Sequence, residues 1–393
     1  MDKFIYVDNA ATTALSEKVF EKMKPYFFEE YGNASSIYAL GRRSAAAILN
    51  SRKKIAELIG AEAGEIYFTS SGTESDNWAL LGTLRKLKAK GKTHLITTAI
   101  EHHAVLHAAE KLEKEGFEVS YVPVNSEGIV SPQDIKNVIT EKTALVSVMF
   151  VNNEIGTIQP IEEIGKICRE KGVLFHTDAV QAATHIPINV KNLNVDMLSL
   201  SAHKFHGPKG IGIFYLRKGV IIEQLMFGGG QEKGKRPATE NTAFIVGAAE
   251  ALEEGIKTME ERETRLKVLR NRLYEGLKDI PHSRLNGSFK NRIAGNLNIS
   301  FEGVEGEAIL LSLDNKGIAA SSGSACTSGD LDPSHVLLAI GLPHEIAHGS
   351  VRYSLGEETT EEDIDYIIEA TKEVISKLRE MSPVWEKIKD KEQ

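Results

Sequence analysis

The sequence is poor in cysteine, with only Cys168 and Cys326 among its 393 residues. Two cysteines can form at most one disulfide, and a chain of this length without a secretion signal is expected to keep both thiols reduced. No apolar run reaches the roughly 18–20 residues that span a bilayer, and residues 1–8 read as a short charged strand rather than a signal peptide. We therefore expect a cytoplasmic protein with no membrane partner.

The chain also lacks an excess of basic residues. Its formal net charge is −8 and its isoelectric point is near 5.9, whereas nucleic-acid-binding proteins usually carry a basic footprint. Nucleic acid is therefore not expected as a partner. With 393 residues, 41% of them apolar, the chain is globular in composition and too long for one small core. Two domains are expected.

Short β-rich runs alternate with amphipathic helical stretches between about residues 60 and 216. Several of the runs are almost continuously apolar, as strands buried on both faces of a sheet are. Helical patterns such as Ala104–Lys114 and Ile161–Lys171 separate the earlier runs. This alternation predicts an α/β domain with a mainly parallel central sheet, whose ligands bind beyond the carboxyl ends of the strands. The predicted strands are Glu65–Thr69, His94–Thr98, Val119–Val124, Ala144–Val151, Val173–His176, Met197–Leu200 and Ile211–Leu216.

The carboxyl-terminal third has a different pattern. Residues 243–278 form a long helical pattern rich in Glu, Lys, Arg and Leu, which predicts a connector between domains. After it come a strand at 297–301, a helix at Gly306–Lys316, a Ser- and Gly-rich loop at 321–329, a strand near 350–354 and a final helix from Thr360. This order predicts a smaller α+β domain.

Lys204 follows the predicted strand Met197–Leu200, within the stretch Ser-Ala-His-Lys-Phe-His-Gly-Pro. A lysine at a strand end can bond an aldehyde if nearby positive groups or desolvation lower its pKa, although an isolated loop lysine is more often solvated. Asp178 comes just after the strand Val173–Phe175. Its carboxylate either caps a helix or pairs with a protonated pyridine nitrogen. An aspartate and a lysine at consecutive strand ends are what a pyridoxal site requires.

Residues 69–75, Thr-Ser-Ser-Gly-Thr-Glu-Ser, follow another predicted strand and open a helix. Small hydroxylated residues and a glycine at a helix start can cradle a phosphate. A capping box of Ser71 and Glu74 explains part of the pattern, and the Gly-Lys-Ser/Thr element of a Walker A motif is absent. His102 and Asn153 also follow predicted strands, where an imidazole could stack on a cofactor ring and an amide could meet a ring hydroxyl. Taken singly, each is better explained as a satisfied polar group at a strand end.

The two cysteines have different surroundings. Cys326 lies among Ser, Gly, Thr and Asp residues, a poor composition for a core, and a mobile polar loop suits an exposed nucleophilic thiol. Cys168 lies on the apolar stripe of the helix predicted at Ile161–Lys171, where a thiol is usually a small buried hydrophobic group. We therefore expect chemistry at Cys326 and packing at Cys168.

Together these motifs resemble the cysteine desulfurases, in the class V branch of the fold-type I pyridoxal-phosphate enzymes. The resemblance runs from residues 8–13, Asp-Asn-Ala-Ala-Thr-Thr, to residues 382–385, Ser-Pro-Val-Trp. It is sharpest in the Ser-Ala-His-Lys block, in residues 152–156 and in residues 321–329, Ser-Ser-Gly-Ser-Ala-Cys-Thr-Ser-Gly. The last is similar to the cysteine loop of the nitrogen-fixation and iron–sulfur-cluster desulfurases, in its longer, group I form.

The resemblance implies a fold-type I transferase with a large α/β domain at 15–255 and a small α+β domain at 1–14 and 256–393, the latter carrying the cysteine loop. It implies pyridoxal 5'-phosphate as cofactor, L-cysteine as substrate, no metal, a homodimer, and a sulfur-acceptor or iron–sulfur scaffold protein as partner. The implied catalytic residues are Lys204, Cys326 and His102. The implied cofactor-binding residues are Gly72, Thr73, His102, Asn153, Asp178, Gln181, Ser201, His203, Lys204 and, from the partner subunit, Thr239. The implied substrate-binding residues are Arg352 and Asn33.

Some residues depart from the family pattern. Ala34 and Tyr38 stand where Pro and His are usual, Pro237-Ala238 replaces a small residue followed by Gly, and Thr184-His185 replaces the commoner Gly-Lys. Two rival interpretations share most of the pattern. A class V aminotransferase or selenocysteine lyase would use the same cofactor site, and a silent scaffold would bind assembly partners without turnover. The cysteine loop argues against the former, and the intact lysine, aspartate, arginine and cysteine set argues against the latter.

Overall fold

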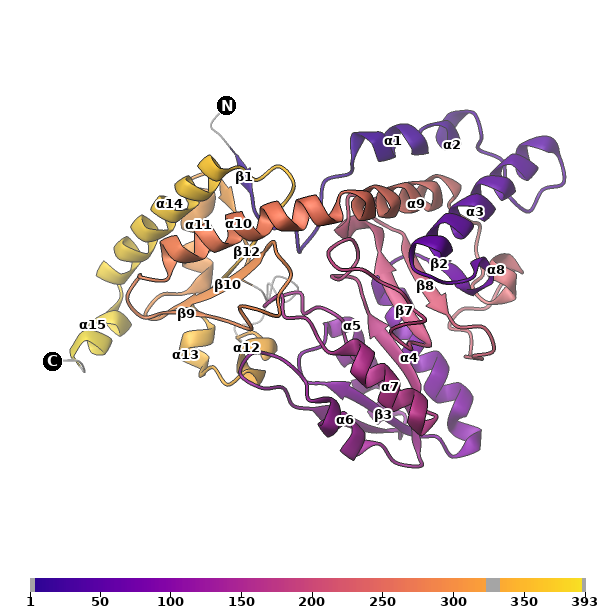
Figure 1. The fold of residues 1–393 in the computed structure, drawn as a ribbon, viewed down its shortest axis with the longest axis horizontal. Helices are drawn as coiled ribbons and strands as arrows, with labels where there is room; N and C mark the ends of the chain where they lie inside the picture. Colours follow the sequence, from indigo (N-terminus) through magenta and orange to yellow (C-terminus); the bar gives the residue numbers. More distant parts are fainter. Residues whose placement is uncertain (1–3, 323–332, 391–393) are drawn as a thin grey trace.

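The computed structural model describes residues 4–322 and 333–390, in a large and a small sheet region joined by two long helices (Figure 1). The large region holds a seven-stranded sheet in the order β2-β8-β7-β6-β5-β3-β4. Strands β3 to β7 are parallel, whereas β8 is antiparallel to both β7 and β2. The predicted mainly parallel α/β sheet is therefore confirmed. The strands are β2 (Ile66–Thr69), β3 (His94–Thr98), β4 (Glu118–Val122), β5 (Thr143–Ser147), β6 (Leu174–Asp178), β7 (Met197–Ser201) and β8 (Gly212–Leu216).

Helices cover both faces of this sheet because its strands are apolar on both sides. Along β8, Ile213 and Tyr215 join one hydrophobic cluster, and Phe214 and Leu216 join the other. The first cluster includes residues of α1 (Glu17–Met23), α3 (Ala39–Leu58), α7 (Ile161–Lys171) and α9 (Thr242–Lys257). The second includes residues of α4 (Gly72–Leu87) and α5 (His103–Lys114). The remaining helices of this region are α2 (Pro25–Phe28), α6 (Pro132–Val138) and α8 (Gln231–Gly234).

The small region combines the start of the chain with its end. Strand β1 (Ile5–Tyr6) pairs in parallel with β11 (Ile318–Ala319). An antiparallel sheet has the order β12-β10-β9, and its own hydrophobic cluster joins Val7 to residues such as Leu297 and Tyr353. This arrangement confirms the predicted α+β character. The other elements are β9 (Ser283–Leu285), β10 (Asn296–Phe301), β12 (Ser350–Ser354), α10 (Met259–Leu277), α11 (Gly306–Asp314), α12 (His335–Ala339), α13 (His344–Ala347), α14 (Glu361–Glu380) and α15 (Pro383–Asp390).

Several predicted elements differ from the structure by one or two residues at their ends, and two differ more. The strand expected over Ala144–Val151 ends at Ser147, and Val151 forms only an isolated bridge with Ile158. The helical pattern at 243–278 is two helices, α9 and α10, with the break at Thr258. No helix in the described ranges is both long enough and apolar enough to cross a membrane.

Candidate functional site

Two predicted residues lie at the carboxyl ends of adjacent parallel strands. Asp178 is the last residue of β6, and Lys204 ends the short 3₁₀ helix η3 (Ala202–Lys204) that follows β7. Burial raises the pKa of Asp178, while the Val180 backbone N–H and the Lys204 charge act in the opposite direction. The two side chains are therefore within electrostatic reach of each other.

Backbone carbonyls of the N-terminal segment hold the Lys204 side chain. Its Nζ donates to the carbonyl oxygens of Ala10 at 2.7 Å and Ala11 at 2.8 Å. Gln181 Nε2 donates to the same Ala10 carbonyl at 2.9 Å. The amine thus lies where β7, the loop after β6 and the segment after β1 meet. Sequence reasoning missed these acceptors, because a backbone carbonyl leaves no mark in the residue pattern.

Asp76, on α4, is a further buried acid of the site that the sequence did not reveal. It is 1% exposed, and its Oδ1 lies 3.5 Å from His176 Nε2. Burial and the neighbouring Asp178 carboxylate raise the pKa of Asp76 well above its ordinary value, and burial lowers that of His176 to about 3. Burial and the repulsion between two close carboxyl groups thus both favour the protonated form of Asp76.

Two of the residues predicted to cradle a phosphate, Gly72 and Ser201, lie close together at the start of α4. A Cβ atom on Gly72 would lie 2.7 Å from Val180 Cγ2 and 3.4 Å from Ser201 Cβ, so Gly72 faces the end of β7. Thr73 is exposed in the first turn of α4. His203 Nδ1 lies 3.1 Å from Thr12 Oγ1, and burial together with the Lys204 charge lowers the pKa of His203 to about 4. Because the first N–H groups of a helix have no partners within the helix, a helix start of this kind can bind an anion.

The capping box predicted from Ser71 and Glu74 is only half formed. Ser71 Oγ accepts the Glu74 N–H at 3.1 Å. The Glu74 carboxylate instead accepts the N–H and the hydroxyl of Ser70, at 2.7 and 2.6 Å.

His102 is the N-cap of α5, and its Nδ1 accepts the Ala104 N–H at 3.1 Å. Burial first, and then the Lys204 charge and neighbouring histidines, lower the pKa of His102 to about 4. A neutral imidazole that accepts at Nδ1 carries its proton on Nε2. His102 is therefore a neutral ring with a fixed tautomer near Lys204.

Arg352, on β12, brings the small region into the site. It is 2% exposed, and it donates from Nη1 to the Asn153 carbonyl at 2.9 Å and from Nη2 to Asp8 Oδ1 at 2.8 Å. Its backbone pairs with Ser321. Asp8 was not predicted, although a polar residue just after a short strand was a usable signal.

Three predicted residues lie elsewhere or outside the described ranges. Asn33 is in the exposed segment between α2 and α3, far from β12 within one chain (Figure 1). Thr239 is exposed between α8 and α9. Cys326 lies outside the described residues. Cys168 is fully buried in the first hydrophobic cluster, which confirms its packing role, and burial raises its thiol pKa to about 12.

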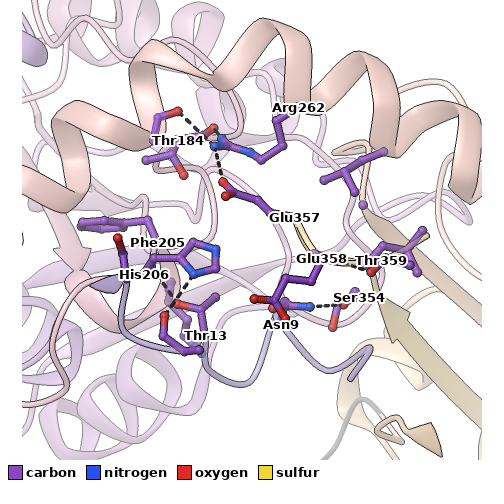
Figure 2. Close-up of a pocket in the computed structure, with 18 of the residues that line it drawn as sticks. Asn9, Thr13, Thr184, Phe205, His206, Arg262, Ser354, Glu357, Glu358 and Thr359 are labelled. Atoms are coloured by element: carbon purple, nitrogen blue, oxygen red, sulfur yellow. Dashed lines mark hydrogen bonds and ion pairs between the residues drawn. The ribbon is translucent and has the colours of Figure 1, made fainter. Parts of the chain in front are cut away.

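A cavity of about 1030 Å³ borders this site between the two sheet regions. Figure 2 shows Arg262 and Glu357 on one side of it and Thr13 and His206 on another. Lys204 and Gln181 line it, but His102, Asp178 and Arg352 do not. The cavity therefore reaches Lys204 from the side of the N-terminal segment and is not the whole of the site.

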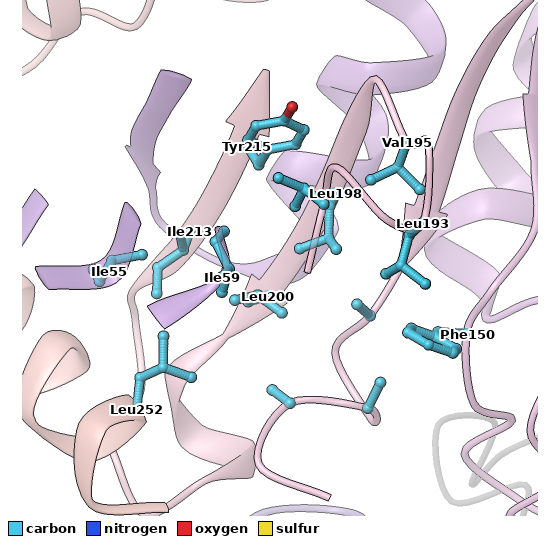
Figure 3. Packing of buried hydrophobic residues seen from close by; sticks show 14 of the residues in the cluster. Ile55, Ile59, Phe150, Leu193, Val195, Leu198, Leu200, Ile213, Tyr215 and Leu252 are labelled. Carbon is cyan, nitrogen blue, oxygen red and sulfur yellow. The ribbon is translucent and has the colours of Figure 1, made fainter. Parts of the chain in front are cut away.

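The strands beneath the site are held by close packing. Figure 3 shows Leu198 and Leu200 of β7 beside Ile213 and Tyr215 of β8, with Ile59 nearby. All five side chains are at most 2% exposed. Such dense packing restricts movement of the strand ends, and it therefore restricts movement of Asp178 and Lys204.

Comparisons with known proteins agree with this geometry. The profile of the family described as Aminotransferase class-V matches residues 5–367. A cysteine desulfurase IscS from Clostridium botulinum is 54% identical over the full length of both chains, and one from Methanosarcina thermophila is 54% identical over 98% of this chain and 95% of its own. A solved NifS-like protein superposes with a TM-score of 0.90 at 39% identity, covering 96% of this chain and all of its own. The structure of SspA in complex with cysteine superposes with a TM-score of 0.80 at 36% identity, covering 89% and 98%.

Proposed function

The chain belongs to the class-V aminotransferase family and within it is a cysteine desulfurase, and we propose that it takes sulfur from L-cysteine with pyridoxal phosphate on Lys204 and holds it as a persulfide on Cys326. The observation that carries the proposal is the placement of Lys204 and Asp178 at adjacent strand ends, beside a helix start where only a glycine fits. The products are L-alanine and the enzyme persulfide.

The described residues fit pyridoxal phosphate. Gly72 places the start of α4 close to Ser201 at the end of β7, and the buried Asp178 offers a carboxylate. When bound, the cofactor supplies an aldehyde that bonds amines and a ring that withdraws electrons. The residues that would hold it are Lys204, Asp178, Gly72, Thr73, Ser201, His203, His102, Asn153, Gln181 and Thr239 of the partner subunit.

Asp178 and Lys204 divide the acid–base work. Asp178 offers its carboxylate to the ring nitrogen, and the neighbouring Asp76, whose pKa burial raises well above its ordinary value, favours its protonated form. Lys204, once its amine is free, removes the Cα proton of the substrate. The carbonyls of Ala10 and Ala11 orient Nζ, which limits its approach to one direction.

Arg352 binds the substrate carboxylate, since a guanidinium can grip both oxygens. Asp8 and the Asn153 carbonyl fix its plane, and we propose that Asn33 assists it. The related SspA is known in complex with cysteine, which supports an amino acid as the ligand.

The sulfur step involves Cys326. Its thiolate attacks the substrate sulfur, and the Cβ–S bond breaks with its electron pair left on the carbon side. One proton is delivered to Cβ and the proton that Lys204 removed goes back to Cα, which completes alanine and leaves the persulfide on Cys326. His102, with its proton on Nε2, handles proton transfer during this exchange. At the first residue of the cysteine loop, Ser321 pairs with Arg352. Beyond the loop, Ser334 Oγ donates to Glu154, next to Asn153. One end of the loop is thus paired with the substrate-binding Arg352, and the chain beyond its other end is bonded next to Asn153, which supports delivery of the thiol to this site.

Exposed apolar side chains support a homodimer. Phe28 is 75% exposed, Tyr31 68%, Ile37 89% and Phe227 83%. A soluble monomer rarely leaves so many large apolar groups in water, and an interface over them would cover the segments that carry Asn33 and Thr239. We propose the division into residues 15–255 and 1–14 with 256–393 as the two domains, and a sulfur-acceptor or iron–sulfur scaffold protein as the partner that takes the persulfide sulfur.

The test is to incubate the purified protein with L-cysteine and a reductant and to measure alanine and sulfide together. Equal amounts of both are expected. Borohydride reduction followed by peptide mapping should place the cofactor on Lys204. Sulfide accompanied by pyruvate instead of alanine would indicate an eliminating lyase, and a label on Lys209 would move the cofactor site.

A further inference from the structure

The segment 228–241 has a strained backbone that requires support. It runs between β8 and α9, and it carries Thr239. Three non-glycine residues in it adopt left-handed backbone angles, namely Glu232 with φ 46°, Lys233 with φ 59° and Ala238 with φ 103°. Side chains disfavour this region, so other contacts must hold the segment in place.

A buried ion pair holds the first part of the segment in place. Glu232, 6% exposed, accepts two bonds from Arg52 on α3, at 2.8 and 2.5 Å. It also accepts the Phe68 N–H of β2 at 3.0 Å. A carboxylate with all its partners satisfied is a firm anchor, and this one fixes the segment to the edge of the large sheet.

A second ion pair, further along the segment, binds it to helix α4, which starts at Gly72. Arg236 Nε and Nη2 donate to the two carboxylate oxygens of Glu74, at 2.8 and 3.0 Å. Their side chains are 19% and 17% exposed, so solvent screens the pair only in part. Glu74 is in the first turn of α4, two residues after Gly72.

Glu74 poses an electrostatic problem for a phosphate at this helix start. An unpaired carboxylate there would repel a bound dianion, and repulsion is strong where water is partly excluded. Arg236 neutralises that charge. Thr239 lies three residues further along the same segment.

We propose that Arg236 is a positioning residue for the cofactor phosphate, acting through Glu74 on the chain's own helix start and through Thr239 on the partner's phosphate. The inference rests on the proposed function, in which Gly72, Thr73 and the partner's Thr239 bind that phosphate.

The test compares the binding of pyridoxal phosphate and of pyridoxal to the cofactor-free full chain, followed by absorbance. Arg236→Gln should weaken pyridoxal phosphate about tenfold or more, because a charge-assisted two-point contact is lost, and should leave pyridoxal unchanged. The matched control is Arg85→Gln. Arg85 makes the same two-point pair with Glu115, at 3.0 and 2.7 Å, near the other end of α4, and its loss should change neither affinity.

Further variants separate the possible failures. The double variant Glu74→Gln with Arg236→Gln should bind pyridoxal phosphate no more weakly than Arg236→Gln alone, because Arg236 acts through Glu74. If Thr239→Ala weakens pyridoxal phosphate but Arg236→Gln does not, the positioning role is overturned while the proposed function stands. If Thr239→Ala has no effect, the partner contact itself is wrong. If circular dichroism shows that Arg236→Gln does not fold, Arg236→Lys serves instead, since it keeps the charge and loses the two-point geometry. An unchanged preference of Arg236→Lys for pyridoxal phosphate over pyridoxal would overturn the proposal.

Discussion

The substitution Arg352→Lys tests the substrate site most directly. Arg352 is 2% exposed and is held by Asp8 and the Asn153 carbonyl. A lysine keeps the positive charge, but it reaches less far and offers one ammonium in place of a planar fork. One of two charge-assisted bonds to the substrate carboxylate is lost, at about 1.5–3 kcal/mol. The expected fall in kcat/KM is therefore about 10- to 150-fold.

The assay is the initial rate of alanine formation over a range of L-cysteine concentrations, with cofactor content measured in parallel. Cofactor content should stay the same, because Arg352 is proposed to contact the substrate and not the cofactor. Arg272→Lys is the control. Arg272 bonds Asp365 on the surface at 2.8 and 2.6 Å, where an ion pair contributes little, so its kinetics should match the parent. A kcat/KM for Arg352→Lys within about twofold of the parent would refute the reasoning and move the carboxylate site elsewhere.

Three further predictions concern other parts of the molecule. Cys326→Ser should bind pyridoxal phosphate and change its absorbance on addition of L-cysteine, yet form almost no alanine, because a hydroxyl is a poor nucleophile toward sulfur. Near-normal sulfide release by Cys326→Ser would contradict the persulfide. The control Cys168→Ser should keep most of its activity. Mixing Lys204→Ala and Thr239→Ala chains under conditions of subunit exchange should restore activity, because one site of each mixed dimer carries neither change. A fully active monomer, identified by light scattering, would disprove the shared site. His176 has its pKa lowered by burial from 6.5 to about 3, so the unfolded chain binds its proton first as the pH falls below 6.5. The free energy of unfolding should then fall by about 1.4 kcal/mol per pH unit from this group, and His176→Gln should flatten that slope in urea unfolding at pH 7, 6 and 5.

The positions of the main site residues could be predicted because parallel strands bring their carboxyl ends to one edge. Asp178 and Lys204 were placed at neighbouring strand ends from apolar runs alone, and the structure confirms that placement. The helix Ile161–Lys171 was also predicted at its observed bounds, since Gly172 follows it with φ 65° and ends it. The run 144–151 was assigned too long because Val148 and Phe150 are buried in the core without belonging to a strand.

Contacts that join distant parts of the chain could not be predicted in the same way. The pairing of Asp8 with Arg352 connects residues 344 positions apart, and the bonds from Lys204 to the Ala10 and Ala11 carbonyls connect residues 194 and 193 positions apart. Asp76 occurs inside a helical pattern, and only the crossing of α4 over β6 and β7 brings it near Asp178. Periodicity reports which face of an element is buried, and it does not report which buried polar groups meet.

The pairing of the first strand with late parts of the chain has a consequence for biosynthesis. Asn9 bonds the Ser354 carbonyl, 345 residues further on, and the Ala10 and Ala11 carbonyls that hold Lys204 belong to the same segment. A ribosome adds about 5–20 residues per second, so the N-terminal strand waits for many seconds before its partners emerge. The lysine's surroundings are complete only when translation is nearly finished. Incomplete chains released early should therefore be unable to retain the cofactor, and only finished chains should become coloured.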